Sequence, residues 1–207
     1  MGKTALSLHL AEMLDGEIVS ADSRLFYRGM DIGTAKPTQE ERARVPHHLV
    51  DIADPDETVG LAEFQEQAYV AIDAIHARSR LPLLVGGTGQ YVRAVVQGWR
   101  IPRVPPDAGL RADLEAEVER EGAAALHARL AQLDPLAAER IDPTDPQRTN
   151  WPREVIEITG RPLSELQAEQ PAERLDYEVL RLVACPQPRS VLHQRIEQRF
   201  DAMMAEG

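Results

Sequence analysis

Four short apolar runs along the chain have the pattern of buried strands. They lie at residues 17–20, 48–52, 82–85 and 179–184. Short apolar runs bounded by polar or turn residues are typical of strands that are covered on both faces. The pattern therefore predicts four buried strands.

Between and after these runs lie segments in which apolar residues recur at helical spacing. The first segment places four residues on one face: Leu6, Leu10, Met13 and Leu14. A second repeats the pattern with Leu61, Phe64, Ala68, Ile72 and Ile75, and a last one with Leu192, Ile196, Phe200 and Met203. Strands that alternate with helices need crossover connections, which build a parallel sheet with helices on both faces. We therefore expect an α/β core.

The pattern changes between about residue 105 and residue 170, where no strand-like run occurs and Ala and Glu dominate. Apolar residues at helical spacing mark short helices, which Gly122 and Asp134-Pro135 interrupt: Leu110, Leu114, Val118, Leu126, Leu130 and Leu133. We expect an all-helical insertion over residues 105–172. The α/β core is then divided between residues 1–104 and an incomplete return over 173–207.

The composition narrows the class of protein. With 207 residues, 43% of them hydrophobic and 28% charged, the chain has enough apolar side chains for a core and is neither disordered nor fibrous. No apolar run approaches the ~20 residues that span a bilayer, and no signal peptide follows Met1. Cys185 is the one cysteine, which excludes an internal disulfide and fits a reducing compartment. We expect a cytoplasmic monomer with no membrane partner, and the net charge of −11 argues mildly against nucleic acid as a partner.

Gly2-Lys3-Thr4 stands directly before the first predicted helix and matches the second half of the phosphate loop G-x-x-x-x-G-K-[ST]. In such a loop, backbone N–H groups and the helix N-terminus hold phosphate oxygens, the lysine neutralises their charge and the threonine hydroxyl binds Mg²⁺. A tripeptide that begins a helix by chance is the alternative interpretation. The strand and the first glycine of such a loop are not in this sequence, so we expect a protein shortened at its N-terminus.

Further motifs follow in a fixed order. Residues 17–37 read EIVSADSRLFYRGMDIGTAKP, and residues 46–52, 82–91, 145–148 and 159–163 read PHHLVDI, PLLVGGTGQY, DPQR and TGRPL. This series resembles the bacterial tRNA dimethylallyltransferases, also called tRNA isopentenyltransferases, from the first residue to the last predicted helix. Members of that family continue well beyond the point where this chain stops, so the resemblance implies truncation at both ends.

The resemblance implies a P-loop-kinase-like parallel sheet that does not phosphorylate, with helices on both faces and an all-helical insertion that binds tRNA. The implied reaction transfers a dimethylallyl group from dimethylallyl diphosphate to N6 of adenosine 37, beside the anticodon of tRNAs that read codons beginning with U. Its products are N6-dimethylallyladenosine and diphosphate. In family members, the residues that match Gly2, Lys3 and Thr4, the last through Mg²⁺, stabilise the departing diphosphate.

Asp22 lies at the carboxyl end of the first predicted strand, where parallel-sheet enzymes place functional groups. The N6 amine of adenine is a poor nucleophile because its lone pair is delocalised into the ring, so a carboxylate must accept its proton as the new bond forms. Asp22 matches the catalytic aspartate of the family; the alternatives are a helix cap or a group near Mg²⁺. Ser23, Arg24 and Leu25 complete the stretch that contacts tRNA in relatives, in which a glutamine is common in place of Leu25.

Gly86-Gly87-Thr88-Gly89 ends another predicted strand. Gly86 and Gly87 allow close approach of the backbone to a ligand, which the resemblance makes the diphosphate. Thr88 matches a family residue that lines the reaction channel beside the substrate base and contacts tRNA. The alternative is a threonine that caps the following helix.

In the predicted insertion, Arg111, Gln147 and Arg148 match positions that contact tRNA in the family. A solvated surface arginine is the alternative for Arg111. Where Trp151 and Pro152 stand, the family typically has Arg and Ala. Proline favours a helix start or a kink at that point.

The charge of the insertion opposes RNA binding, because residues 107–142 carry four Arg against nine Asp and Glu. A helix can collect its arginines on one face, and a flipped base adds stacking contacts. Three alternatives to tRNA prenylation stay open: an adenylate isopentenyltransferase, a small-molecule P-loop kinase, and an inactive fragment of the transferase.

Two further groups of residues have simpler interpretations. His47 and His48 are adjacent, so on a strand their side chains point to opposite faces, and we expect structural or loop contacts instead of a metal pair. Thr34 and Lys36 either reach the substrate or form the turn before Pro37.

Overall fold

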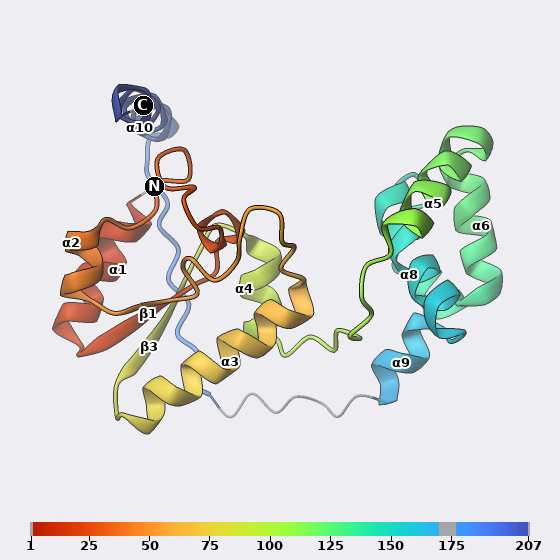
Figure 1. Cartoon of the computed structure of the whole chain (residues 1–207), viewed down its shortest axis with the longest axis horizontal. Helices are drawn as coiled ribbons and strands as arrows, with labels where there is room; N and C mark the ends of the chain where they lie inside the picture. The colour runs from red at the N-terminus through yellow and green to blue at the C-terminus, as the bar shows by residue number, and fades with distance from the viewer. Residues whose placement is uncertain (1, 170–176, 207) are drawn as a thin grey trace. The chain divides into compact units, whose positions relative to one another are not determined.

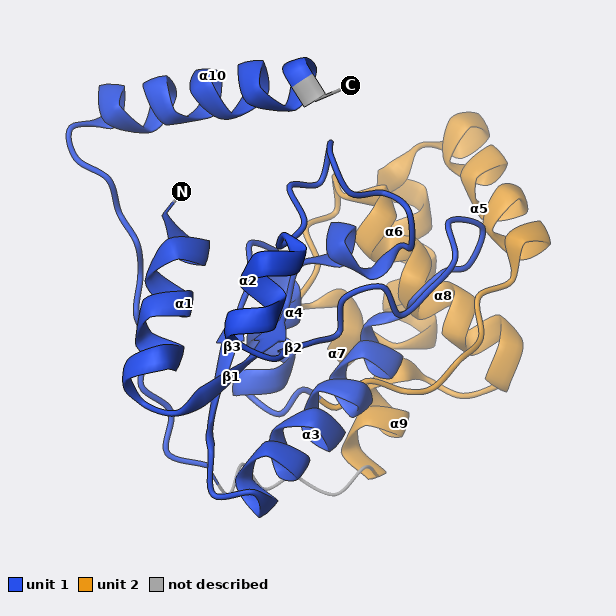
Figure 2. Cartoon of the chain, turned by 60° about the vertical axis from the view of Figure 1, so that its left-hand side comes forward, with its two compact units in different colours: residues 1–99, 174–207 blue, residues 100–173 orange. Residues whose placement is uncertain are grey.

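The computed structural model describes residues 2–169 and 177–206. The chain divides into two compact units, one formed by Met1–Trp99 with Arg174–Gly207 and the other by Arg100–Glu173 (Figure 2). The second unit lies where the sequence predicts the helical insertion. In the described part of the chain, no helix combines the length and the apolar character needed to cross a membrane.

In the part of the chain that the structure describes, unit 1 contains a parallel sheet of three strands in the order β2-β1-β3. Figure 1 shows β1 and β3 side by side. The strands are β1 (Gly16–Ser20), β2 (His47–His48) and β3 (Leu81–Val85). Ile18 at the centre of β1 aligns with His47 on one side and Leu83 on the other. All five residues of β1 are buried, as the continuous apolar run predicts for a central strand.

Helices cover both faces of this sheet, with α1 (Lys3–Met13) on one face and α3 (Leu61–Ala77) and α4 (Gly89–Val96) on the other, which confirms the predicted α/β fold. The other helices of unit 1 are the 3-10 helix η1 (Ser23–Phe26), α2 (Gln39–Arg44) and α10 (Arg189–Glu206). Ile18 packs with Leu8 and Ala11 of α1 in one apolar cluster. Val19, on the opposite face, belongs to a larger cluster with residues of α3 and α4.

The buried face of α1 differs from the predicted one. Leu6, Met13 and Leu14 are 42%, 66% and 52% exposed, whereas Leu8 and Ala11 are buried. Ser7 is buried as well, since its hydroxyl donates to the carbonyl of Thr4 and leaves no polar group unpaired. The helix therefore approaches β1 and β3 through its small residues.

Two predicted strands are wrong. The second strand comprises only His47–His48, because Leu49 and Asp51 adopt φ values of 59° and 58° and turn the chain away from the sheet. Residues 179–184 form no strand, and Leu180 and Val183 are 83% and 86% exposed. An apolar run becomes a strand only if a neighbour completes its hydrogen-bond ladder, and none of the described strands pairs with this segment.

Every secondary-structure element in the described residues of unit 2 is a helix. Its helices are α5 (Ala108–Glu121), α6 (Ala123–Leu133), α7 (Pro135–Ala138), α8 (Pro146–Thr159) and α9 (Leu163–Glu169). Gly122 and Asp134 separate the first three, as predicted. The most deeply buried apolar side chains include Leu126, Leu130 and Val155.

Glu17 organises the amino-terminal end of the sheet. Its side chain is 2% exposed and lies 2.6 Å from Nε2 of His48, 2.7 Å from Arg78 and 3.2 Å from Arg80. Burial alone would raise the pKa of this carboxyl, but the hydrogen bonds from its three partners outweigh burial and lower the pKa to about 2. His47 hydrogen-bonds through Nδ1 to the carbonyl of Val45, so both histidines have structural partners.

We expect Glu17→Gln to lower the free energy of unfolding at pH 7 by about 3 kcal/mol. Because the folded-state pKa lies below the ordinary value of 4.5, the ionised carboxylate stabilises the fold above pH 4.5. This contribution disappears as the pH falls towards 2, so the two proteins should converge there. Urea unfolding across this range measures the difference. Glu12→Gln, which removes an exposed partner of Arg44, is the control and should have little effect.

Candidate active site

Two groups of predicted site residues, 22–25 and 86–88, lie at the carboxyl ends of β1 and β3. The N–H group of Ala21 donates to the carbonyl of Val85 over 2.8 Å, which continues the pairing one step beyond β1. The loops that follow the two strands therefore leave the sheet side by side. One carries Asp22 and Ser23, and the other carries the glycines and Thr88.

The close contact between the two loops requires glycine at position 86. A Cβ atom on this residue would lie 2.1 Å from the carbonyl oxygen of Ala21 and 2.3 Å from its carbonyl carbon. Backbone atoms cannot yield as a flexible side chain can, so only glycine fits. This contact gives Gly86 a packing role in addition to the predicted approach to a ligand.

Gly87 marks the place where the predicted charged groups meet. A Cβ atom here would lie 2.9 Å from Nζ of Lys3 and 3.5 Å from Oδ2 of Asp22. Lys3 extends from the first turn of α1 and has no ion-pair partner among the described residues. Thr4 follows it in the same exposed turn. The ammonium of Lys3, the carboxylate of Asp22 and the backbone of Gly87 thus lie close together. A cation beside backbone without a side chain is what a site for a phosphate-bearing ligand requires.

Thr88 holds the two loops together. It occupies the N-cap position of α4, but its side chain makes no capping hydrogen bond, so the capping interpretation is wrong. Its Oγ1 instead accepts a hydrogen bond from the N–H of Ser23 over 3.3 Å and lies 3.5 Å from Oγ of Ser23. The two hydroxyl groups are therefore neighbours beside Asp22.

Asp22 uses its two carboxylate oxygens differently. It is the N-cap of η1, and Oδ1 accepts a hydrogen bond from the N–H of Arg24 over 3.2 Å. The capping interpretation is thus correct for this oxygen. Oδ2 points to the space beside Gly87 and Lys3. The cap fixes the side chain and leaves one oxygen facing the shared volume.

An aromatic stack that sequence reasoning missed supports both loops from the core. The ring of Phe26, at the end of η1, lies 5.7 Å from that of Phe64 and 5.8 Å from that of Tyr91. The Phe64 and Tyr91 rings are 4.5 Å apart. Since Phe26 follows Asp22 and Tyr91 follows Thr88, the stack couples the positions of the two functional segments. Leu25, the residue before Phe26, is half-buried.

Lys36 is buried, and its amine is bound by other groups of the protein. Its side chain is 2% exposed, and Nζ donates to the carbonyl of Tyr27 over 2.7 Å and to Asp31 and Asp51 over 2.6 Å each. Burial alone would lower the pKa of this amine, but the two carboxylates outweigh it and raise the pKa. The Thr34 hydroxyl donates to the carbonyl of Met30. Both residues therefore shape the loop, as the turn interpretation predicts.

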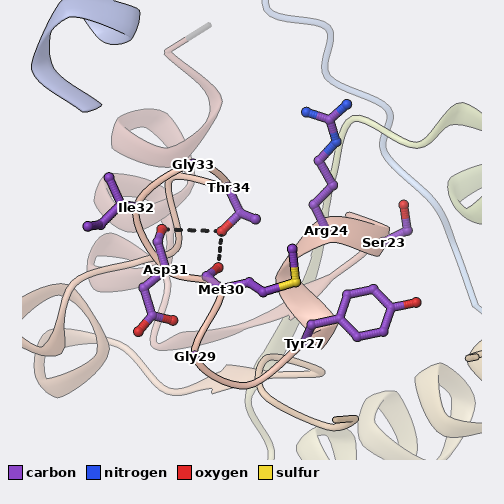
Figure 3. Close-up of a pocket in the computed structure, with 9 residues that line it drawn as sticks. All are labelled: Ser23, Arg24, Tyr27, Gly29, Met30, Asp31, Ile32, Gly33 and Thr34. Carbon is purple, nitrogen blue, oxygen red and sulfur yellow. Dashed lines mark hydrogen bonds between the residues drawn. The ribbon is translucent and has the colours of Figure 1, made fainter. Parts of the chain in front are cut away.

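A cavity of about 640 Å³ lies between this loop and η1 (Figure 3). The residues around it are Ser23, Arg24, Tyr27, Gly29, Met30, Asp31, Ile32, Gly33 and Thr34. Ser23 also contacts Thr88, so the cavity adjoins the site described above.

The site residues predicted in unit 2 fall into two groups. Arg111 is engaged by its own unit, because Nε lies 2.8 Å from the buried carboxylate of Glu154. Gln147 and Arg148 are exposed in the first turn of α8. This helix begins at Pro146 and continues through Pro152, so a helix start at the second proline is wrong.

A parallel sheet with a lysine at a helix N-terminus, a carboxylate and a glycine-rich turn at its carboxyl end defines a P-loop-like α/β protein. The family model of the IPP transferases matches residues 25–207. The chain belongs to this family.

Named relatives agree with this assignment. A tRNA dimethylallyltransferase of Roseiflexus castenholzii is 55% identical over all of this chain and 66% of its own length, and one of Herpetosiphon aurantiacus is 52% identical over 64% of its length. The chain therefore spans about two thirds of the length of these curated relatives.

Solved structures are also similar. The full-length tRNA isopentenylpyrophosphate transferase of Bacillus halodurans is 42% identical, with a TM-score of 0.58 over all of this chain and 63% of that one. A eukaryotic dimethylallyltransferase acting on tRNA is 29% identical, with a TM-score of 0.75 over all of this chain and 50% of that one.

Proposed function

We propose that the protein transfers a dimethylallyl group from dimethylallyl diphosphate to N6 of adenosine 37 in tRNAs that read codons beginning with U. Its relatives are named for dimethylallyl or isopentenyl transfer to tRNA. The observation that carries the proposal is the convergence of Lys3, Asp22 and Gly87 at one point. We further propose a cytoplasmic monomer that acts on the anticodon loop.

The residues divide the reaction into two tasks. N6 of adenine attacks the allylic carbon that bears the diphosphate, the new N–C bond forms, and the C–O bond to the diphosphate breaks. Oδ2 of Asp22 accepts the proton that N6 loses, which prevents a positive charge from building up on the amine. Lys3 and the N–H groups at the start of α1 and at Gly87 stabilise the negative charge of the departing diphosphate.

The same positions fit Mg²⁺ and the target base. The Thr4 hydroxyl and diphosphate oxygens are the hard oxygen donors that Mg²⁺ prefers, and Mg²⁺ would neutralise part of the leaving group's charge. Thr88 and Ser23 line the approach of the base to Asp22. Gln147 and Arg148 contact the RNA backbone from unit 2, while Arg111 contributes through its outer nitrogens.

A three-substrate assay tests the proposal. The chain is incubated with dimethylallyl diphosphate and Mg²⁺ in the presence of either tRNA or AMP, and ATP consumption is followed separately. We expect prenylated adenosine in tRNA, unmodified AMP and no use of ATP. Prenylated AMP would identify an adenylate isopentenyltransferase, and ATP-dependent phosphorylation of a small molecule would identify a kinase. No product in any arm would identify an inactive fragment.

A further inference from the structure

The carboxyl-terminal end of η1 is held by groups from two other segments. The last carbonyls of a helix have no partner within it. Three consecutive carbonyls at this end accept hydrogen bonds from outside the helix, those of Leu25, Phe26 and Tyr27. The first two are bound by the N–H groups of Asp51 and Ala53 over 3.0 Å each, and the third by Nζ of Lys36 over 2.7 Å. This end of η1 is therefore fixed at every carbonyl.

Lys36 connects these contacts. Its side chain is 2% exposed, and Nζ also donates to Oδ1 of Asp51 over 2.6 Å. One ammonium thus holds both the carbonyl of Tyr27 and the residue that binds the carbonyl of Leu25. Asp51 adopts a φ value of 58°, a left-handed conformation that costs free energy for a residue with a side chain. Without Lys36, Asp51 would keep only its ion pair with Arg42 among the described residues.

The opposite end of η1 carries Asp22. This residue is the N-cap, and its carbonyl accepts a hydrogen bond from the N–H of Leu25 over 3.0 Å. A 3-10 helix advances about 2 Å per residue, so the two ends of a single turn move together. A shift at the carboxyl-terminal end of η1 therefore moves Oδ2 of Asp22 relative to Lys3 and Gly87.

We propose that Lys36 is a positioning residue that sets the place of Asp22 through η1, and this proposal rests on the proposed function. The three N–H donors of its ammonium match three acceptors within the protein, so Lys36 acts through other residues. The rate of a chemical step depends steeply on geometry, and a displacement of about 1 Å can cost up to about a hundredfold. A purely structural lysine would affect stability without any link to Asp22.

A double-mutant cycle with Asp22 tests the proposal. Lys36→Met removes the ammonium and keeps a long side chain, and it should slow single-turnover prenyl transfer about tenfold at saturating anticodon stem-loop and dimethylallyl diphosphate. In the Asp22→Asn background the same substitution should change the rate less than about twofold, because the carboxylate that Lys36 places is no longer present. A tenfold loss in both backgrounds would overturn the proposal, as would no loss in either.

Glu17→Gln is the matched control. The Glu17 side chain is also 2% exposed and has three ion-pair partners, but it lies at the opposite end of the sheet from Asp22. It should destabilise the fold and leave the rate unchanged at a temperature where circular dichroism shows every variant to be folded. Equal slowing in Glu17→Gln and Lys36→Met would make the loss a general consequence of lower stability, against the proposal.

Asp51→Asn repeats the test with a milder change and decides it if Lys36→Met does not fold. The backbone N–H of this residue can still donate to the carbonyl of Leu25, whereas the ion pairs with Lys36 and Arg42 are lost. We expect about threefold slowing with Asp22 present and none in the Asp22→Asn background. The same loss in both backgrounds, or in neither, contradicts the proposal.

Two further measurements separate this proposal from the proposed function. Lys36→Met should bind dimethylallyl diphosphate as tightly as the wild type; a weaker affinity would assign Lys36 to diphosphate binding and refute its role through Asp22. Prenyl transfer by the wild type to the stem-loop is followed as well. Its absence overturns the proposed function and this inference with it, whereas wild-type rates in Lys36→Met overturn this inference alone.

Discussion

Asp22→Asn is expected to slow prenyl transfer to tRNA at least about a hundredfold while RNA affinity changes by less than about twofold. The amide can still accept the hydrogen bond from the N–H of Arg24, so the start of η1 stays in place. It cannot accept a proton from N6 of adenine. Single-turnover rates with saturating RNA and dimethylallyl diphosphate measure the chemical step, and filter binding measures the affinity.

Asp54→Asn is a suitable control for this substitution. Asp54 is an exposed aspartate of the same unit that pairs with Arg28 over 2.8 Å, and it takes no part in the site. Its loss should leave the rate unchanged. If Asp22→Asn also retains the wild-type rate, the proton goes elsewhere and the role of Asp22 is wrong.

The second large effect concerns stability. Gly86→Ala should lower the free energy of unfolding by about 3 kcal/mol or more, because the new methyl group would overlap the backbone of Ala21. The loops after β1 and β3 would have to separate, which also removes Lys3 and Asp22 from their common volume. Urea unfolding monitored by circular dichroism gives the first quantity, and prenyl transfer gives the second.

Gly89→Ala serves as the control in the same turn. A Cβ atom on Gly89 meets nothing within 4 Å, and the residue begins α4, where alanine is the better helix former. Its stability should be unchanged or slightly higher. Wild-type stability of Gly86→Ala would show that the two loops can move apart at little cost.

The parts of the fold that could be predicted are those with a local signal. The runs at 17–20 and 82–85 are strands, and the spacing from Leu61 to Ile75 gives α3. The segment 179–184 has an equally strong apolar pattern but forms no strand, because a strand depends on a neighbour that the pattern does not contain. The buried face of α1 also depends on a neighbour, because close packing against the sheet favours Ala11 over the larger Leu14.

The candidate site likewise has one part that the sequence pattern predicts and another that it does not. The order of strands and turns places Asp22 and Thr88 at one end of the sheet, so their proximity follows from the fold class. The burial of Lys36 does not follow from any local pattern, because its partner Asp51 is separated from it by fifteen positions and by α2. The stack of Phe26, Phe64 and Tyr91 likewise joins three segments that only tertiary structure brings together.

The division of labour between the two oxygens of Asp22 has a consequence for repeated turnover. Oδ1 accepts the hydrogen bond from the N–H of Arg24, whereas Oδ2 faces Lys3. Protonation and deprotonation of Oδ2 would therefore leave the hydrogen bond at the start of η1 intact. The site would then return to its starting shape after each cycle with no segment to refold.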